Sequence, residues 1–150
     1  MNVRRPPPAV LHASPDEVEA QFYEAMQQGD LSRLMGVWAD DDEVVCVHPG
    51  GGRLIGTEAI GASFEALFAA GGVPVVPEQV RRMSAAGTAV HHLVERVTVT
   101  SREGPRTAWV FATNVYLKTA QGWRMVVHHA SPAAEPPPAD LREPAGNTLH

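Results

Sequence analysis

The sequence of 150 residues predicts an α+β domain in which three N-terminal helices pack on a mainly antiparallel sheet. Two observations predict this class. Residues 14–72 contain three stretches with apolar residues at helical spacing, and only short strand-like runs lie between them. From about residue 76 to residue 131 the pattern is that of four long strands joined by short turns, which is typical of antiparallel neighbours.

The helices are recognised by their capping residues and apolar stripes. Ser14 and Glu17 form a capping box, and Pro15 occupies the first helical position. Gly29 ends this helix, and Asp30 caps the next one. The apolar stripes are Val18, Phe22, Ala25 and Met26 in the first helix, Leu31, Leu34, Met35 and Trp38 in the second, and Ile60, Phe64, Leu67 and Phe68 in the third, which Thr57 caps.

The strand pattern leaves one face of the sheet without a cover. The short runs are 44–48 and 53–55, and the long segments are 78–85, 88–101, 106–119 and 123–131. The last two long segments are apolar on both of their alternating faces. Because the helices can cover only one face, a monomer would expose a large apolar surface on the other. We therefore predict a homodimer that forms through the open sheet face.

Composition narrows the class of protein. The formal net charge is −5, and no basic run exceeds two residues, which argues against nucleic acid as a partner. Cys46 is the only cysteine, so an internal disulfide and a thiolate-rich zinc site are excluded. No stretch approaches the roughly 20 apolar residues of a membrane helix, and we expect a cytoplasmic protein. The Pro-rich segments 1–13 and 133–150 are predicted to be disordered tails around a domain at 14–132.

The last strand ends in two adjacent histidines, within Trp-Arg-Met-Val-Val-His-His-Ala-Ser-Pro at 123–132. Successive side chains of a strand point to opposite faces, so His128 and His129 cannot serve one pocket. Counting along the strand places His129 on the face of Trp123. We predict that His129 faces the pocket and that His128 is a structural residue of the sheet or of an interface.

The central strand carries further polar residues whose faces the sequence leaves open. His91 and His92 face opposite ways, so at most one of them points inward. An inward Glu95 would be a carboxylate able to act as a base, and an outward Glu95 would be a dimer-face or solvent residue. His48, His129 and either His91 or His92 would together supply three ligands for a metal ion. Nothing in the sequence brings these side chains together, and we predict neither a metal nor a cofactor.

Several short motifs together resemble a known superfamily. They are Gln28-Gly29-Asp30-Leu31, Trp38-Ala39-Asp40-Asp41, Gly-Thr-Glu-Ala-Ile at 56–60 and Gly-Trp-Arg-Met-Val-Val-His-His at 122–129. Their order and spacing resemble the nuclear transport factor 2-like (NTF2-like) superfamily, and within it the SnoaL-like and ketosteroid isomerase-like proteins. The resemblance implies a cone-shaped domain, usually dimeric, whose curved sheet and helices enclose an apolar pocket. It fixes no single function, because this fold hosts isomerases, cyclases, dehydratases, transport factors and oligomerisation modules.

The residues that the resemblance would carry over from ketosteroid isomerase are all replaced. The position of its oxyanion-hole tyrosine falls on Phe22, and the adjacent Tyr23 points about 100° away around the helix. The position of its aspartate base falls near Cys46, and His48 lies two residues further along the same face. The position of its protonated aspartate falls on Asn114. These departures argue against authentic steroid isomerisation.

A polar site in an apolar pocket is nevertheless expected. His48, His129 and Asn114 are the candidate catalytic residues, because imidazole suits proton transfer near neutral pH and a neutral amide can polarise a carbonyl. The His-Pro-Gly-Gly run that begins at His48 and the paired histidines also resemble a group in this superfamily that places its terminal histidine at the His129 position. The predicted pocket wall comprises Phe22, Tyr23, Trp38, Trp123 and Met125.

Two classes of function follow from these residues. The first is a protein that binds a small apolar or partly polar ligand, with isomerase- or lyase-type proton transfer on an unknown substrate if it is an enzyme. The second is a non-catalytic dimerisation or accessory module in which the pocket is a filled core.

Overall fold

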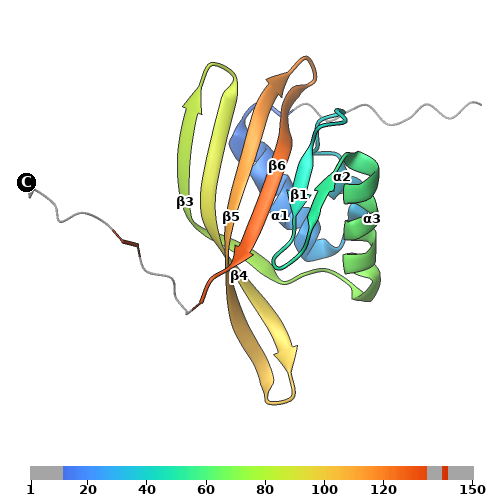
Figure 1. Ribbon diagram of the computed structural model, residues 1–150, viewed down its shortest axis with the longest axis vertical. Helices are drawn as coiled ribbons and strands as arrows, with labels where there is room; N and C mark the ends of the chain where they lie inside the picture. The colour runs from blue at the N-terminus through green and yellow to red at the C-terminus, as the bar shows by residue number, and fades with distance from the viewer. Residues whose placement is uncertain (1–11, 135–139, 142–150) are drawn as a thin grey trace, which may run out of the picture.

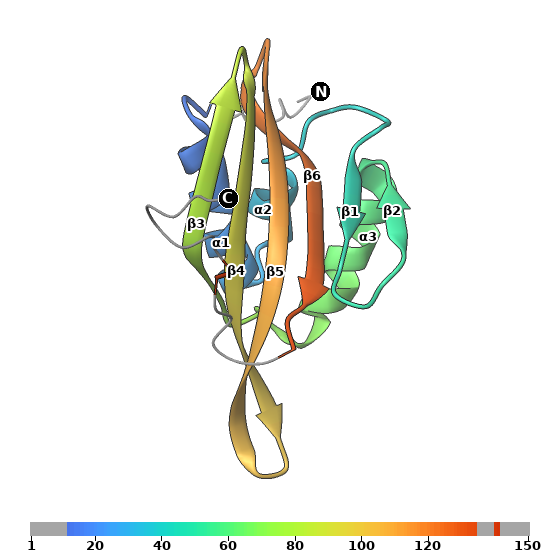
Figure 2. The same cartoon turned by 60° about the vertical axis from the view of Figure 1, so that its left-hand side comes forward.

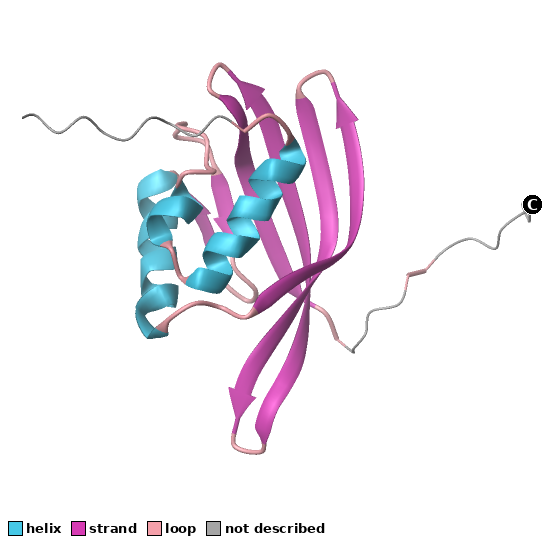
Figure 3. Cartoon of the chain, turned by 180° about the vertical axis from the view of Figure 1, so that it is seen from behind, coloured by secondary structure: helices cyan, strands magenta, loops and turns pink. Residues whose placement is uncertain are grey.

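The computed structural model describes residues 12–134 and 140–141, in which helices cover one face of a six-stranded sheet (Figures 1 and 3). The elements are α1 (Pro15–Gln28), α2 (Leu31–Met35), β1 (Val45–Val47), β2 (Arg53–Ile55), α3 (Thr57–Leu67), the short 3-10 helix η1 (Phe68–Ala70), β3 (Val75–Ala85), β4 (Thr88–Ser101), β5 (Gly104–Thr119) and β6 (Gly122–Pro132). The strand order is β2-β1-β6-β5-β4-β3, and only β1 and β6 are parallel neighbours. The predicted α+β class is confirmed. Most of the two predicted tails lies outside the described residues.

The N-terminal cap of α1 forms largely as the sequence predicts. The Ser14 hydroxyl accepts a hydrogen bond from the Glu17 backbone N–H at 3.2 Å. The Glu17 carboxylate in turn accepts from the Ala13 N–H, rather than from the cap residue itself. Gly29 ends the helix at a φ of 67°, a left-handed conformation that glycine adopts without strain. Local sequence rules are therefore sufficient to place α1.

The other two helices differ from the prediction in their limits. Asp30 caps α2 by accepting from the Arg33 N–H at 3.0 Å, but the helix ends at Met35 and does not reach Trp38. Trp38 instead forms a short parallel bridge with Met125 of β6. The third helix begins at Thr57, the residue predicted to cap it; its cap is Gly56, which makes no side-chain bond.

A β-bulge interrupts the pairing of β5 with β6. Tyr116 pairs with Met125 and Val115 pairs with Val127, so Val126 is an extra residue between two regular pairs. An extra residue on one strand reverses the alternation of side chains beyond it. Counting faces from the start of β6 therefore fails after the bulge.

The bulge exchanges the expected positions of the two histidines. His128 pairs with Asn114, is 2% exposed and faces the helices. His129 is exposed and faces away from them. The predicted inward position of His129 is therefore wrong, because His128 occupies it. The prediction that the two side chains face opposite ways is confirmed.

Beyond the body of the sheet, β4 and β5 continue as a two-stranded arm at 98–107 (Figure 2). The last pair between β3 and β4 joins Val75 to Val97, and the last pair between β6 and β5 joins Pro132 to Val110. Past these pairs β4 and β5 pair with each other, and Thr98 at the base of the arm also donates to the Pro74 carbonyl.

The face of the sheet opposite the helices, called the outer face below, is open and partly apolar. Phe111 and Leu117 of β5 are 36% and 38% exposed there, and Val115 of β5 and its partner Val127 of β6 lie on the same face. Among the described residues, no helix combines the length and apolar character needed to span a bilayer.

Candidate functional site

A cavity of about 340 Å³ lies between α1, α3 and the inner face of the sheet, at the end nearest the arm. Its wall is mainly apolar, with Met26 from α1, Phe64 and Leu67 from α3, and Val97 and Val110 from the sheet. Three of its lining residues carry titratable side chains. These are His48, Glu95 and His128. A mostly apolar hollow with a few polar groups is the usual form of a small-molecule site.

Four buried side chains form one directed chain of hydrogen bonds behind this cavity. The Tyr23 hydroxyl donates to Glu95 Oε2 at 2.8 Å, and Asn114 Nδ2 donates to the Tyr23 oxygen at 3.0 Å. His128 Nδ1 lies 2.6 Å from Asn114 Oδ1, which can only accept. The proton of the neutral His128 ring is therefore on Nδ1. Its Nε2 carries a lone pair and lies 3.9 Å from Glu95 Oε2.

Burial decides the charge of these groups. Burial raises the pKa of Glu95 to about 7, although the hydrogen bond from Tyr23 acts in the opposite direction. Burial, together with the nearby His48 and His129, lowers the pKa of His128 to about 3. Burial and the charge of Glu95 raise the pKa of Tyr23 well above its usual value. Near neutral pH, Glu95 is therefore the member of this chain that gains and loses a proton.

His48 reaches the cavity from the residue directly after β1. Its Nε2 lies 2.9 Å from the Ser63 hydroxyl, which donates its own proton to the Ile60 carbonyl at 2.7 Å. The hydroxyl must then accept from His48 Nε2–H. Burial lowers the pKa of His48, which keeps the ring neutral. Burial and the charge of Glu95 also raise the pKa of the neighbouring Cys46 to about 12, so its thiol is not a nucleophile.

The structure brings together a set of polar residues that differs from the predicted one. His48 lines the cavity, and Asn114 joins the buried chain that holds Glu95. His129 lies in a separate hollow on the outer face, beside His92 and Phe111. The position that the sequence assigned to His129 is occupied by His128.

None of the five residues predicted for the pocket wall lines the cavity. Phe22 and Tyr23 are both buried, because α1 packs a wide stripe against the sheet, and the Phe22 ring lies 4.9 Å from that of His128. Trp38 and Met125 belong to the buried core, and Trp123 packs against it. The sequence therefore placed these residues in or against the core but not on the cavity, which Tyr23 meets only through its hydrogen bond to Glu95.

Glu95 is the residue of this site for which the sequence left both faces of the strand open. It is 4% exposed and faces inward on β4. Alternation along β4 could not decide this, because Leu93 and Val94 on opposite faces are both buried. The tyrosine hydroxyl that reaches Glu95 comes from Tyr23, the residue next to Phe22.

A second buried polar cluster lies near the start of α1. His91 Nδ1 lies 3.1 Å from Glu19 Oε1, and its Nε2 lies 3.9 Å from Asp16 Oδ1. The ligand-type atoms of these three residues lie within 4.8 Å of one another. The Arg82 guanidinium, however, contacts Asp16 at 2.9 Å and Glu19 at 4.0 Å. It already supplies the positive charge that the two carboxylates require, and we assign no metal to this cluster.

Comparisons with known proteins agree with this architecture. A family model described as SnoaL-like domain matches residues 16–135. A candidate association domain of calcium/calmodulin-dependent protein kinase type II from Thiobacillus denitrificans has 36% sequence identity and a TM-score of 0.75, covering 83% of this chain and 99% of that one. A candidate dehydratase of the NTF2-like family from Streptomyces avermitilis has 27% identity and a TM-score of 0.72, covering 80% and 94%.

A more distant structure supports the fold alone. The CaMKII hub of S. rosetta has 22% identity and a TM-score of 0.65, covering 82% of this chain and 100% of that one. A comparison with curated protein sequences finds no match. The family model spans all the helices and strands described above except the first residue of α1. The chain therefore belongs to the SnoaL-like domain family, within the NTF2-like superfamily.

Proposed function

We propose that this protein binds a small, mostly apolar molecule in the cavity and moves a proton on it with the carboxylate of Glu95. One observation carries this proposal. A buried carboxyl group stands in the wall of an otherwise apolar cavity, and burial brings its pKa to about 7, where it can both take up and release a proton. A carboxylate in such a place destabilises the fold, so a functional role is the simplest reason to keep it.

The chemistry that suits this arrangement is proton abstraction next to a carbonyl group. Glu95 takes the proton, and the electron pair of the broken C–H bond moves into the enolate. The protonated Glu95 then returns a proton to the same carbon or to a neighbouring one. Tyr23 and Asn114 act through Glu95 as positioning residues, since each holds the next member of the chain. His48 Nε2–H, now directed to Ser63, is a donor for the carbonyl oxygen.

Hydrogen–deuterium exchange tests this proposal without knowledge of the natural substrate. Methyl octyl ketone is incubated with the protein in deuterium oxide, and loss of its α-hydrogens is followed by NMR. We expect exchange roughly a hundred-fold or more faster than in buffer, and exchange at the buffer rate with Glu95→Gln. His129→Gln on the outer face is the matched control and should exchange like the wild type. Equal exchange by the wild type and Glu95→Gln would exclude Glu95 as the base.

A second function, self-association, is favoured by a different observation. The outer face leaves Phe111 and Leu117 partly exposed beside Val115 and Val127. Two proteins of similar structure carry the words association domain and hub in their names. A homodimer through the outer face would cover these side chains. The two proposals are compatible, because the cavity lies on the opposite face of the sheet.

A further inference from the structure

The arm carries an arginine on the same face as the cavity wall. Val97, Val99 and Ala108 at the base of the arm line the cavity. The β4–β5 pairing runs without a register shift, and it places Arg106 directly opposite Val99. Residues that are directly opposite each other in an antiparallel pair share a face. Arg106 therefore belongs to the inner face of the arm.

The position of Arg106 is at the mouth of the cavity. Val99 is 40% exposed although it lines the cavity, so it marks the rim. The Cβ atoms of such a cross-strand pair lie about 4.5–5.5 Å apart, well within the length of an arginine side chain. Its neighbours on this face of the arm are Val97, Ser101, Gly104 and Ala108, and none of them is acidic. Within the described part of the chain, Arg106 forms no salt bridge.

Charge inside the cavity has the opposite sign. Glu95 provides a carboxyl group, and the residues that line the cavity in the described structure include no lysine or arginine. An anionic group placed beside Glu95 would be buried next to a like charge without a counter-ion. An anion is therefore disfavoured inside and favoured only at the mouth.

We infer that the ligand has an apolar body that fills the cavity and a terminal carboxylate that Arg106 binds at the mouth. This inference rests on the proposed function, because it takes the cavity to be the ligand site. It adds an orientation: the carboxylate points outward along the arm, and the reacting end points inward toward Glu95. Arg106 is a binding residue in this arrangement and takes no part in the proton transfer.

The dimensions set the length of such a ligand. Glu95 and Val99 are four residues apart on one strand, which corresponds to about 13 Å at the usual rise per residue. An apolar cavity of about 150 Å³ holds one benzene molecule, so the cavity of about 340 Å³ holds a molecule of about twice that size. A carboxylic acid with a chain of about ten carbon atoms meets both limits, because a zigzag of bonds of about 1.5 Å advances roughly 1.3 Å per carbon atom.

Two matched probes test the inference. One is methyl octyl ketone, and the other is the same ketone with the far methyl group replaced by a carboxylate. Binding of each to the full chain is measured by calorimetry at low salt. We expect the keto acid to bind about five-fold more tightly than the ketone, as for one partly exposed ion pair. Arg106→Gln should abolish this preference and leave the ketone affinity unchanged.

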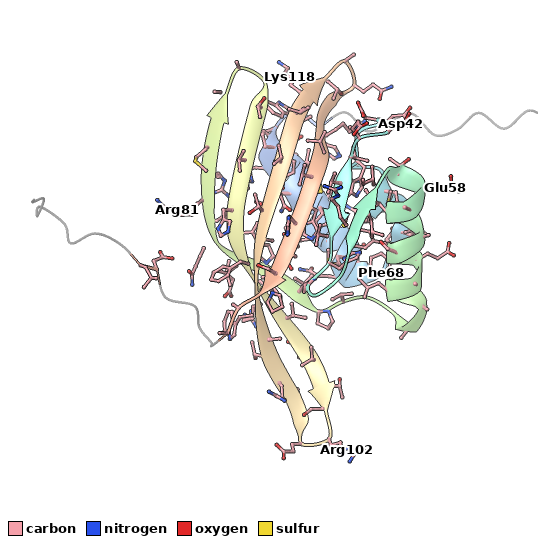
Figure 4. All side chains as sticks on the ribbon, in the orientation of Figure 1. Asp42, Glu58, Phe68, Arg81, Arg102 and Lys118 are labelled. Carbon is pink, nitrogen blue, oxygen red and sulfur yellow. The ribbon has the colours of Figure 1, made fainter. Side chains whose placement is uncertain are left out.

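Arg102→Gln is the matched control, because Arg102 lies at the tip of the same arm, away from the helices (Figure 4). It should keep the preference for the keto acid. The inference is overturned if the wild type shows no preference, if neither probe binds, if Arg106→Gln weakens both probes equally, or if Arg102→Gln has the same effect as Arg106→Gln. Deuterium exchange that depends on Glu95 without a carboxylate preference would leave the proposed function standing and reject the role of Arg106. An Arg106-dependent preference without exchange would support this inference and reject the proton transfer.

Discussion

Burial disfavours the charged form of both Glu95 and His128, and their contributions to stability change with pH in opposite directions. Burial raises the pKa of Glu95 from 4.5 to about 7, so its contribution to stability falls as the pH rises through this window. Burial lowers the pKa of His128 from 6.5 to about 3, so its contribution is complete above 6.5 and is lost as the pH falls toward 3. Between 4.5 and 6.5 the two slopes cancel in the wild type.

Replacing either residue should expose the slope of the other. Relative to the wild type, Glu95→Gln should gain stability with rising pH between 4.5 and 6.5, by about 1.4 kcal/mol per pH unit for one proton. His128→Gln should lose stability with rising pH over the same window. Urea unfolding followed by circular dichroism at several pH values measures both slopes. Slopes of the same sign in the two variants would contradict the assignment of a neutral Glu95 beside a neutral His128.

At the scale of elements, one glycine fixes how the segment after η1 passes the end of α1. A Cβ at Gly72 would collide with the backbone carbonyl of Gln27, which cannot move without disrupting the helix. Gly72→Ala should therefore destabilise the fold by about 3 kcal/mol or more. Gly52→Ala is the matched control, because a Cβ there would meet no atom within 4 Å, and its effect should stay below about 1 kcal/mol. Equal urea midpoints for the two variants would show that this contact is not tight.

The elements also show which parts of the structure could be predicted from sequence. The cap of α1 and the antiparallel order of the long strands depend on residues that are close in the sequence, and both predictions are confirmed. The bulge at Val126 depends on distant partners: Met125 bonds to the backbone of Val37 and Ala39, and the strand after the bulge pairs with β1. The sequence Val126-Val127 contains no signal that Val126 is the bulge residue. Because the bulge could not be predicted, counting along the strand assigned His129, rather than His128, to the site.

Over the whole molecule, the sheet separates two surfaces with different chemistry. The inner face holds Glu95 and its hydrogen-bonded partners under the helices, and the outer face holds exposed apolar side chains such as Phe111. Alternation along the last two long strands predicted this division, because both of their faces are apolar and the helices can cover only one. It could not predict Glu95 or Arg106, since each depends on the register of β4 and β5 in this chain. Those registers are set by strand pairing across the whole sheet.

The open face leads to the last prediction, which concerns assembly. We expect the wild type to sediment at twice the monomer mass of 16.1 kDa at micromolar concentration. Phe111→Glu should shift it to the monomer mass, because a carboxylate in the centre of an apolar interface would be buried without a partner. Ile55→Glu is the control, since Ile55 is 48% exposed on the edge strand β2 and not on the central strands. A monomeric wild type, or equal dissociation by Ile55→Glu, would reject the outer face as the interface. Deuterium exchange by the Phe111→Glu monomer should persist, because every member of the Glu95 chain comes from a single copy of the protein.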